Sequence, residues 1–335
     1  MKFSHIAIAM LCIGTISCGA KNGANEATSS VDSTSVSTTK LTDVVFNADS
    51  AYSYVKAQVD CGPRIPGTKG HDKCQRYLID QLRRFGADSI IEQRTNVTTY
   101  RNDVYHICNI MGCYNTSATK RVLLLAHWDT RPWADNDSRE NRDKPVPGAN
   151  DGGSGVGVLL EVARQLGMKS PQIGVDILFV DAEDSGHSSG WGDGGDSWAL
   201  GTQYWAQNMP YTSANRPVYG ILLDMVGGQD AKFHREYYSN EYAPQILDKV
   251  WSIAARSGYE ERFRNVASGA VMDDHYYVNQ AGIPCIDIIE CDNPITKNFH
   301  PSWHTINDDM SVIDRQSLRE VGQTVINTIY TEPIN

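Results

Sequence analysis

Four short runs of branched or leucine-rich apolar residues recur between residues 121 and 289, and stretches of helical periodicity separate them. The runs are "RVLLLAHWDT", "VDILFVDAED", "YGILLDMVG" and "IPCIDII". Their apolar residues are continuous rather than alternating, which is typical of strands that are covered on both faces. The pattern therefore predicts an α/β fold, a three-layer α/β/α sandwich around a central mixed, mostly parallel sheet.

Capping and turn residues delimit the helices expected around this sheet. Residues 47–50 form a cap signal before a helix in "SAYSYVKAQV", and Gly86 ends a second helix in "HDKCQRYLIDQLRRFG". Further helices are expected in "GVGVLLEVARQLG", "APQILDKVWSIAARSG" and "DRQSLREVGQTVINTIY", and two strand-like pieces in "DSIIEQRTNVTTY" and "VYHICNIMGCY". No internal repeat interrupts this order, so residues 45–335 are expected to form a single domain.

The N-terminal segment differs in character from this domain. "MKFSHIAIAMLCIGTISCG" has a basic start, an apolar stretch too short to span a bilayer, and small residues before Cys18, which together indicate an export signal over residues 1–18. The ending "TISC" resembles a bacterial lipobox. We therefore expect a periplasmic protein anchored to a bacterial membrane by a lipid on Cys18, with plain secretion as the alternative. Residues 19–44 are small and polar, which is typical of a flexible tether.

Charge and cysteine content narrow the classes of function. The 335 residues carry a formal net charge of -10, and the basic residues are scattered, which argues against a nucleic-acid groove or an anionic-membrane patch. We expect a monomer. Six cysteines follow the export signal, and an oxidising compartment would allow them fifteen complete pairings. None lies in a Cys-x-x-Cys pair, which disfavours a thiolate zinc site; the six are Cys61, Cys74, Cys108, Cys113, Cys285 and Cys291.

Ionisable residues follow three of the four apolar runs in the C-terminal direction. They are His127 with Asp129, then residues 181–184, then Asp224. In open α/β sheets, ligands bind outside the carboxyl ends of the strands, so we expect these side chains to converge on one rim. Within "ILFVDAEDSG", three carboxylates in four residues repel one another, and open solvent, a basic partner or a metal ion must make them tolerable.

Asp151, Asp184 and His304 form a candidate metal site. Each also has an ordinary explanation: an N-cap aspartate, an acid in a solvated loop and an exposed histidine. Zinc accepts imidazole nitrogen and carboxylate oxygen, and a catalytic zinc site needs three protein ligands with one position open. The set therefore fits catalytic zinc, and Glu183, next to Asp184, would remain available as a general acid and base.

Two further groups are candidates for the walls of a pocket. "GAVMDDHYYVNQAGIPCIDI" places Asp273 before a predicted helix, where N-capping is the ordinary explanation. Tryptophans in glycine-rich loops are poor core candidates and are better explained as walls of a small-ligand pocket. The tryptophans in question are Trp191, Trp198, Trp205 and Trp303.

Taken in order, the motifs resemble a known family. "LLLAHWDTRP", "PGANDGGSGVGVLLEVAR", "ILFVDAEDSG", "GILLDMVG", "MDDH" followed by "GIPCIDII", and "WHTINDDM" are similar to the zinc aminopeptidase superfamily. They resemble more closely its glutaminyl-peptide cyclotransferase branch, found in animals and some bacteria, and "CGPRIPGT" fits the same branch. The resemblance covers about residues 45–330, and six motifs in the right order are far more specific than any single one.

The resemblance implies roles for particular residues. One zinc ion per chain would be held by Asp151, Asp184 and His304. Glu183 would carry protons, while Asp224, hydrogen-bonded to Asp273, would hold the leaving amide or the tetrahedral intermediate. The implied reaction converts the N-terminal glutamine of peptides and proteins to pyroglutamate, with release of ammonia.

The substrate contacts implied by the resemblance are Trp198, Trp303 and Met272. The two tryptophans would force the glutamine side chain into a curled shape. The animal enzymes have glutamate at the position of Asp184 and glutamine at that of Met272, which bears on the ligand geometry and on one substrate contact.

Two other functions remain open from the sequence. Dizinc aminopeptidases of the superfamily use five ligand positions, with Asp151 bridging the metals and Glu183 as the base. Those positions fall here on His127, Asp151, Asp184, Asp224 and His304. The third possibility is an anchored binding protein that has kept the scaffold but lost catalysis. Such a loss is expected to remove a metal ligand or the base, and here every role is filled by a chemically competent residue.

Overall fold

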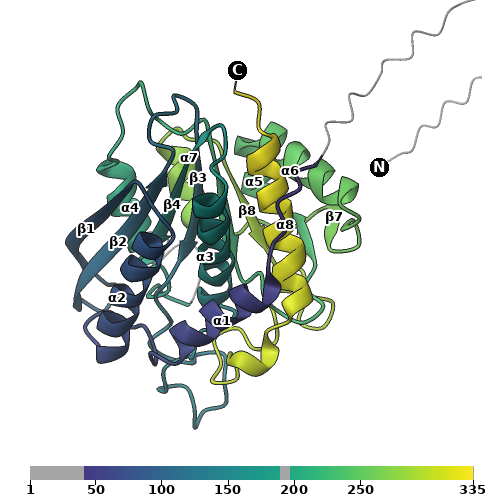
Figure 1. Ribbon diagram of the computed structural model, residues 1–335. Coiled ribbons are helices and arrows are strands. Elements are labelled where there is room, and N and C mark those ends of the chain that lie inside the picture. Colours follow the sequence, from purple (N-terminus) through teal and green to yellow (C-terminus); the bar gives the residue numbers. More distant parts are fainter. Residues whose placement is uncertain (1–40, 189–196, 335) are drawn as a thin grey trace, which may run out of the picture. The chain divides into compact units, whose positions relative to one another are not determined.

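A mixed, mostly parallel sheet forms the centre of the computed structural model, which describes residues 41–188 and 197–334 (Figure 1). Its strand order is β1-β2-β4-β3-β5-β8. The strands are β1 (Ser89–Thr98), β2 (Val104–Tyr114), β3 (Arg121–His127), β4 (Gly174–Val180), β5 (Tyr219–Asp224) and β8 (Cys285–Ile289). β3, β4, β5 and β8 pair in parallel, whereas β2 is antiparallel to β1 and β4. The predicted sheet is confirmed.

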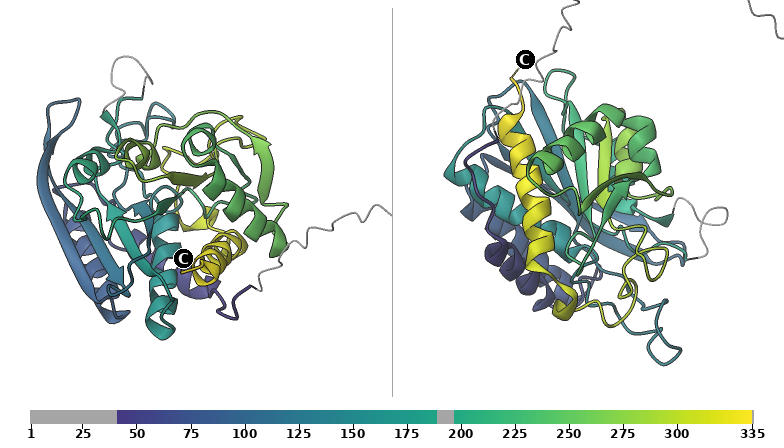
Figure 2. Two further views of the ribbon diagram at one scale, coloured as in Figure 1. Left: turned by 90° about the horizontal axis from the view of Figure 1, so that it is seen from above. Right: turned by 90° about the vertical axis from the view of Figure 1, so that its right-hand side faces the viewer.

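Helices cover both faces of this sheet. They are α1 (Ala48–Val59), α2 (Lys69–Arg84), α3 (Gly153–Met168), α4 (Leu200–Gln207), α5 (Tyr237–Tyr242), α6 (Pro244–Arg256), α7 (Asp274–Gln280) and α8 (Arg315–Thr331). In Figures 1 and 2, α1, α2, α3 and α8 lie on one face, and α4 and α7 lie on the other. The three-layer α/β/α sandwich is therefore confirmed.

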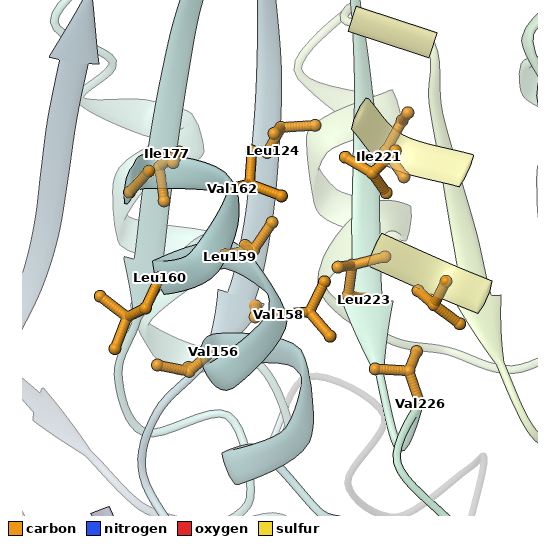
Figure 3. Close-up of a cluster of buried hydrophobic side chains, with 14 of the residues drawn as sticks. Leu124, Val156, Val158, Leu159, Leu160, Val162, Ile177, Ile221, Leu223 and Val226 are labelled. Carbon is orange, nitrogen blue, oxygen red and sulfur yellow. The ribbon is translucent and has the colours of Figure 1, made fainter. Parts of the chain in front are cut away.

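The continuous apolar runs are explained by the two cores that flank the sheet. Along β3, Leu124 belongs to the larger core, with α3 and α8, whereas Leu123 and Leu125 belong to the smaller core, with α4 and α7. Successive side chains of a strand point to opposite faces, so both sets must be apolar. Figure 3 shows α3 presenting Val158 and Leu159 to the strands; burying each such side chain contributes about 1.5–3 kcal/mol.

Capping residues in the sequence predicted the starts of α1 and α2 to within a few residues. Asn47 caps α1, because its side chain accepts a hydrogen bond from the Ser50 amide, and Thr68 caps α2 in the same way. Val44 is already buried in the larger core, so the folded part includes it. Two strands, β6 (Phe233–Arg235) and β7 (Phe263–Ala267), were not predicted, and they pair in a separate small sheet. Within the described ranges, no helix has the length and apolarity that a bilayer crossing requires.

Candidate metal centre and active site

The predicted site residues converge at the carboxyl ends of the parallel strands. His127 ends β3, residues 181–184 follow β4, and Asp224 ends β5. Because these strands run in the same direction, their polar ends lie on one rim of the sheet. The rim carries a pocket of about 300 Å³ lined by all the residues to which the family resemblance gives a role: Asp151, Glu183, Asp184, Trp198, Asp224, Met272, Asp273, Trp303 and His304.

Asp151, Asp184 and His304, hereafter the His304 cluster, offer three ligand atoms within 4.8 Å of one another. Nε2 of His304 lies 3.2 Å from Oδ1 of Asp184 and 3.8 Å from Oδ2 of Asp151. Oδ2 of both aspartates is buried without a hydrogen-bond partner among the described residues. Buried carboxylate oxygens without a donor are costly, and two carboxylates with one imidazole are a ligand set of catalytic zinc. The residues therefore fit a zinc ion.

The loop before α3 gives Asp151 its position. The N-cap of α3 is Gly152, not Asp151, and no side chain caps this helix, so the capping explanation for Asp151 is wrong. Gly152 has φ +76°, and a Cβ there would lie 2.8 Å from Cε1 of His127, so only glycine lets the loop approach so closely. The carboxylate of Asp308 accepts hydrogen bonds from the amides of Asn150 and Asp151 at 2.9 and 3.0 Å and holds the loop in place.

A second group, hereafter the His127 cluster, consists of His127, Asp151 and Asp224. Nε2 of His127 lies 3.0 Å from Oδ1 of Asp151 and 3.2 Å from Oδ1 of Asp224. Burial disfavours the charged ring, but hydrogen bonds to Asp129, Asp151 and Asp224 raise the pKa of His127 well above its usual range. In this cluster, the imidazole lies between the two carboxylates.

Two buried aspartates hold the "DAED" segment. Asp129 accepts hydrogen bonds from the amides of Glu183 and Asp184 at 3.0 and 3.1 Å. Asp181 accepts hydrogen bonds from the amides of Cys108 and Ala182 at 2.7 and 2.9 Å, so it fixes the backbone of β2 and of the segment after β4. The crowded carboxylates thus divide between backbone anchoring and the pocket.

Glu183 lines the pocket as a buried carboxyl group. Burial raises its pKa well above the usual range; the charge of His127 opposes this shift, and that of Asp184 adds to it. A carboxyl group whose pKa is raised in this way can both accept and return a proton near neutral pH.

Two residues that hold the His304 cluster were missed in the sequence. Nδ1 of His304 lies 3.1 Å from Oδ1 of Asp135, which orients the ring and leaves Nε2 toward the aspartates. Nη2 of Arg131 lies 2.6 Å from Oδ2 of Asp135, and Nη1 lies 3.3 Å from Oδ1 of Asp184. Arg131 belongs to the "HWDTRP" motif, but nothing in the spacing of Asp135 marks its partnership with a residue 169 positions later.

The backbone is in an unusual conformation at three positions of the site. Ala182, Met225 and His304 have φ values of 51°, 48° and 55°, in the left-handed region that residues with a side chain rarely adopt. They lie beside Glu183, beside Asp224 and at the imidazole itself. Such conformations persist where the surrounding structure enforces them, most often at functional sites.

Asp224 and Asp273 both face the pocket. Asp273 caps the N-terminus of α7, as the sequence predicts, and this structural role does not exclude a role in the pocket. Burial, followed by the charge of Asp224, raises the pKa of Asp273 to about 7. The expected hydrogen bond between the two carboxyl groups stays a prediction.

Aromatic side chains form the walls near His304. The ring of Trp303 stacks 3.7 Å from that of His304, and the ring of Trp198 lies 6.1 Å from it at an interplanar angle of 15°. The pocket prediction is wrong for Trp205, which is buried on α4 in the smaller core, because an unpredicted helix carries it inward. Trp191 lies outside the described residues.

Comparison with known proteins places these features in context. The profile of peptidase family M28 matches residues 109–329. A solved structure of the glutaminyl cyclase of Bacteroides thetaiotaomicron bound to N-acetylhistamine is 46% identical, with a TM-score of 0.84 over 88% of this chain and 100% of that one. A Zn-dependent exopeptidase from Parabacteroides distasonis is 48% identical, with a TM-score of 0.83 over 86% and 99% of the two chains. The glutaminyl-peptide cyclotransferase of Bos taurus is 22% identical over 284 residues, 78% of this chain and 76% of that protein.

Proposed function

This chain belongs to peptidase family M28, and we propose that it acts as a zinc-dependent glutaminyl-peptide cyclotransferase. It is an acyltransferase that converts the N-terminal glutamine of peptides and proteins to pyroglutamate and releases ammonia. The observation that carries the proposal is the pairing of Trp198 and Trp303 around His304, beside the buried carboxyl group of Glu183. The resulting pocket, of about 300 Å³, suits a single curled side chain.

The reaction is an intramolecular aminolysis. The α-amine nitrogen of the substrate bonds to its own side-chain carbonyl carbon, and the bond from that carbon to the amide nitrogen breaks. Asp151, Asp184 and His304 would hold zinc, which supplies a Lewis acid that polarises the carbonyl oxygen. Glu183 takes the proton that the attacking amine loses and delivers it to the departing nitrogen. The chain needs no nucleophilic side chain of its own.

The remaining pocket residues position the substrate. Trp198 and Trp303 restrict the glutamine side chain to a curled shape. Because the two reacting groups are then held together, the entropic part of the activation barrier is smaller. Asp224 and Asp273, which both line the pocket, hold the leaving amide. Met272 contacts the substrate where the animal enzymes have glutamine.

A second candidate function is dizinc aminopeptidase activity. One specific observation favours it: the His127 cluster also brings three ligand atoms within 4.8 Å of one another. We propose one zinc per chain because Nε2 of His127 has a carboxylate on each side at 3.0 and 3.2 Å, closer than the 3.2 and 3.8 Å between Nε2 of His304 and its two carboxylates.

Turnover and metal content distinguish these functions. Purified protein supplied with zinc is expected to convert a glutamine-starting dipeptide to pyroglutamate and ammonia, with one zinc per chain after dialysis. Rapid cleavage of a leucine-starting chromogenic amide, together with two zincs per chain, would establish the aminopeptidase instead. Absence of zinc and of both activities would favour the anchored binding protein.

Replacing Glu183 tests the proposed proton carrier. Glu183→Gln keeps the size of the side chain but cannot accept a proton, so ammonia release is expected to fall by about 10²–10⁴-fold while zinc content is retained. Elemental analysis and the ammonia assay measure the two quantities. A variant with near-normal turnover would remove Glu183 from the mechanism.

We also propose that the protein is exported to the periplasm and anchored to a membrane through a lipid on Cys18. The support is the signal-like segment 1–18 and its "TISC" ending. Metabolic labelling with a radioactive fatty acid, followed by fractionation, tests the anchor. The full chain is expected in the labelled membrane fraction and Cys18→Ala in an unlabelled form; equal labelling of both would contradict the proposal.

A further inference from the structure

The connection between α1 and α2 brings two cysteines together outside the pocket. Cys61 follows the end of α1 by two residues, and Cys74 lies on α2. The first turn of α2 packs directly on the Cys61 segment, because a Cβ on Gly70 would lie 2.4 Å from the carbonyl oxygen of Pro63 and 3.1 Å from that of Cys61. Positions four apart share one face of a helix, so Cys74 lies on the same side of α2 as Gly70.

Side-chain contacts support the same placement. The Cys61 thiol donates to the carbonyl oxygen of Ala57 at 3.2 Å and also interacts with the Cys74 thiol, and Nζ of Lys73 donates to the carbonyl oxygen of Asp60 at 3.1 Å. The hydrogen-bond partners of the other cysteines of the described chain are oxygen atoms. These are the carbonyls of Asn109 for Cys108 and of Ile286 for Cys285, the side chains of Ser89 and Asp176 for Cys113, and that of Ser268 for Cys291.

We propose that Cys61 and Cys74 are an oxidation site that closes to an intramolecular disulfide when a small-molecule disulfide oxidises them. Cys61 is partly exposed and can react with such an oxidant, whereas Cys74 is fully buried and cannot. The inference stands on the α1–α2 connection and does not rest on the proposed catalytic function.

The two thiols are suited to successive steps of thiol–disulfide exchange. The Cys61 thiolate attacks one sulfur of the oxidant and releases the other as a thiolate, which takes up a proton. Cys74 then loses its proton and attacks Sγ of Cys61, which releases the second thiol. Two thiols of the protein are oxidised, and one disulfide is reduced to two thiols.

The electrostatics assign the first attack to Cys61. The hydrogen bond from Cys74 lowers the pKa of Cys61 to about 7; burial opposes this shift, and the charges of Lys73 and Arg64 add to it. Burial raises the pKa of Cys74 well above its usual range. Cys61 is therefore the thiol that loses its proton more readily, and Cys74 is the resolving thiol.

The proposed disulfide would also restrain Arg64, which supports the loop that carries Asp151. The segment that it closes contains Arg64, which is fully buried and donates to the carbonyl oxygens of Pro147 and Gly148 at 2.6 Å each and of Trp128 at 3.1 Å. Pro147 and Gly148 lie just before Asp151 in the chain. A disulfide would limit the freedom of this segment in the unfolded chain and so raise the melting temperature.

The test treats the full chain with oxidised or reduced glutathione, traps free thiols in denaturant, and maps peptides by mass spectrometry. The oxidised sample is expected to contain a peptide pair that joins Cys61 to Cys74 and lacks two hydrogens. Its melting temperature is expected to lie about 5 °C above that of the reduced sample. Both thiols free after oxidation, or either one joined to another cysteine, would overturn the proposal.

Two variants separate the bond from general effects of oxidation. Cys61→Ser is expected to lose the linked peptide and the shift in melting temperature. Cys291→Ser, at another partly exposed cysteine, is expected to keep both. Loss of the linked peptide in Cys291→Ser as well would contradict the assignment. The wild-type peptide map tests the proposal whether or not a variant folds, and none of these measurements depends on ammonia release.

Discussion

The His304 and His127 clusters share Asp151 and the same residue types, but their polar atoms are satisfied differently. In the His304 cluster, Nδ1 of the histidine is engaged by Asp135 at 3.1 Å, and Oδ2 of Asp151 and of Asp184 has no partner in the described chain. In the His127 cluster, Nε2 of the histidine lies 3.0 and 3.2 Å from the carboxylates of Asp151 and Asp224.

This difference teaches that composition alone does not identify a metal site. Buried carboxylates need a positive partner. In the His127 cluster Nε2 of the imidazole lies within 3.2 Å of both carboxylates, whereas in the His304 cluster the oxygens without a partner and an oriented imidazole leave room for a cation. The comparison therefore favours one zinc at the His304 cluster, and three substitutions probe it.

The largest effect is expected from His304→Ala, which removes a proposed zinc ligand. Two carboxylates alone hold zinc weakly, so bound zinc should be lost, and ammonia release should fall by about 10³-fold or more. Elemental analysis after dialysis and the ammonia assay measure these outcomes. Normal zinc content in this variant would place the metal elsewhere.

His127→Asn probes the other cluster and should leave zinc at one per chain. Removing the imidazole leaves the buried carboxylates of Asp151 and Asp224 without the partner that lies 3.0 and 3.2 Å from them, so the free energy of unfolding is expected to fall by about 3 kcal/mol. Denaturant titration and metal analysis measure the two quantities. A fall from two zincs to one would reverse the comparison in favour of the aminopeptidase.

The smallest effect is expected from Asp135→Asn, which weakens the orientation of His304 without removing a ligand. The affinity for zinc is expected to fall by about 10–100-fold, as for other residues that orient metal-binding histidines. Competition with a chelator measures the affinity, and turnover at saturating zinc should return close to the wild-type value. Asp143→Asn, at an exposed aspartate eight residues further along the chain, serves as the matched control. An equal loss of affinity in both variants would show that the contact of Asp135 is not the cause.

Much of the fold could be predicted because its signals are local. The apolar runs that became β3, β4, β5 and β8, and the caps at Asn47 and Thr68, act within a few residues. α4 was missed because its N-cap, Ala199, has φ 52° and no capping side chain. Trp205 was misplaced for the same reason, since an unrecognised helix turns it into the core.

The sequence by itself determined the layered fold and the residue types of the site, because strand periodicity and side-chain chemistry are properties of neighbouring residues. Only the tertiary structure decided which polar atoms are satisfied. Asp135 reaches His304, Asp308 holds the Asp151 loop, and His127 lies between two carboxylates, and each contact joins residues that are far apart in the chain. The physical reason is that the need of a buried charge for a partner is set by its surroundings in space, which the order of residues does not display.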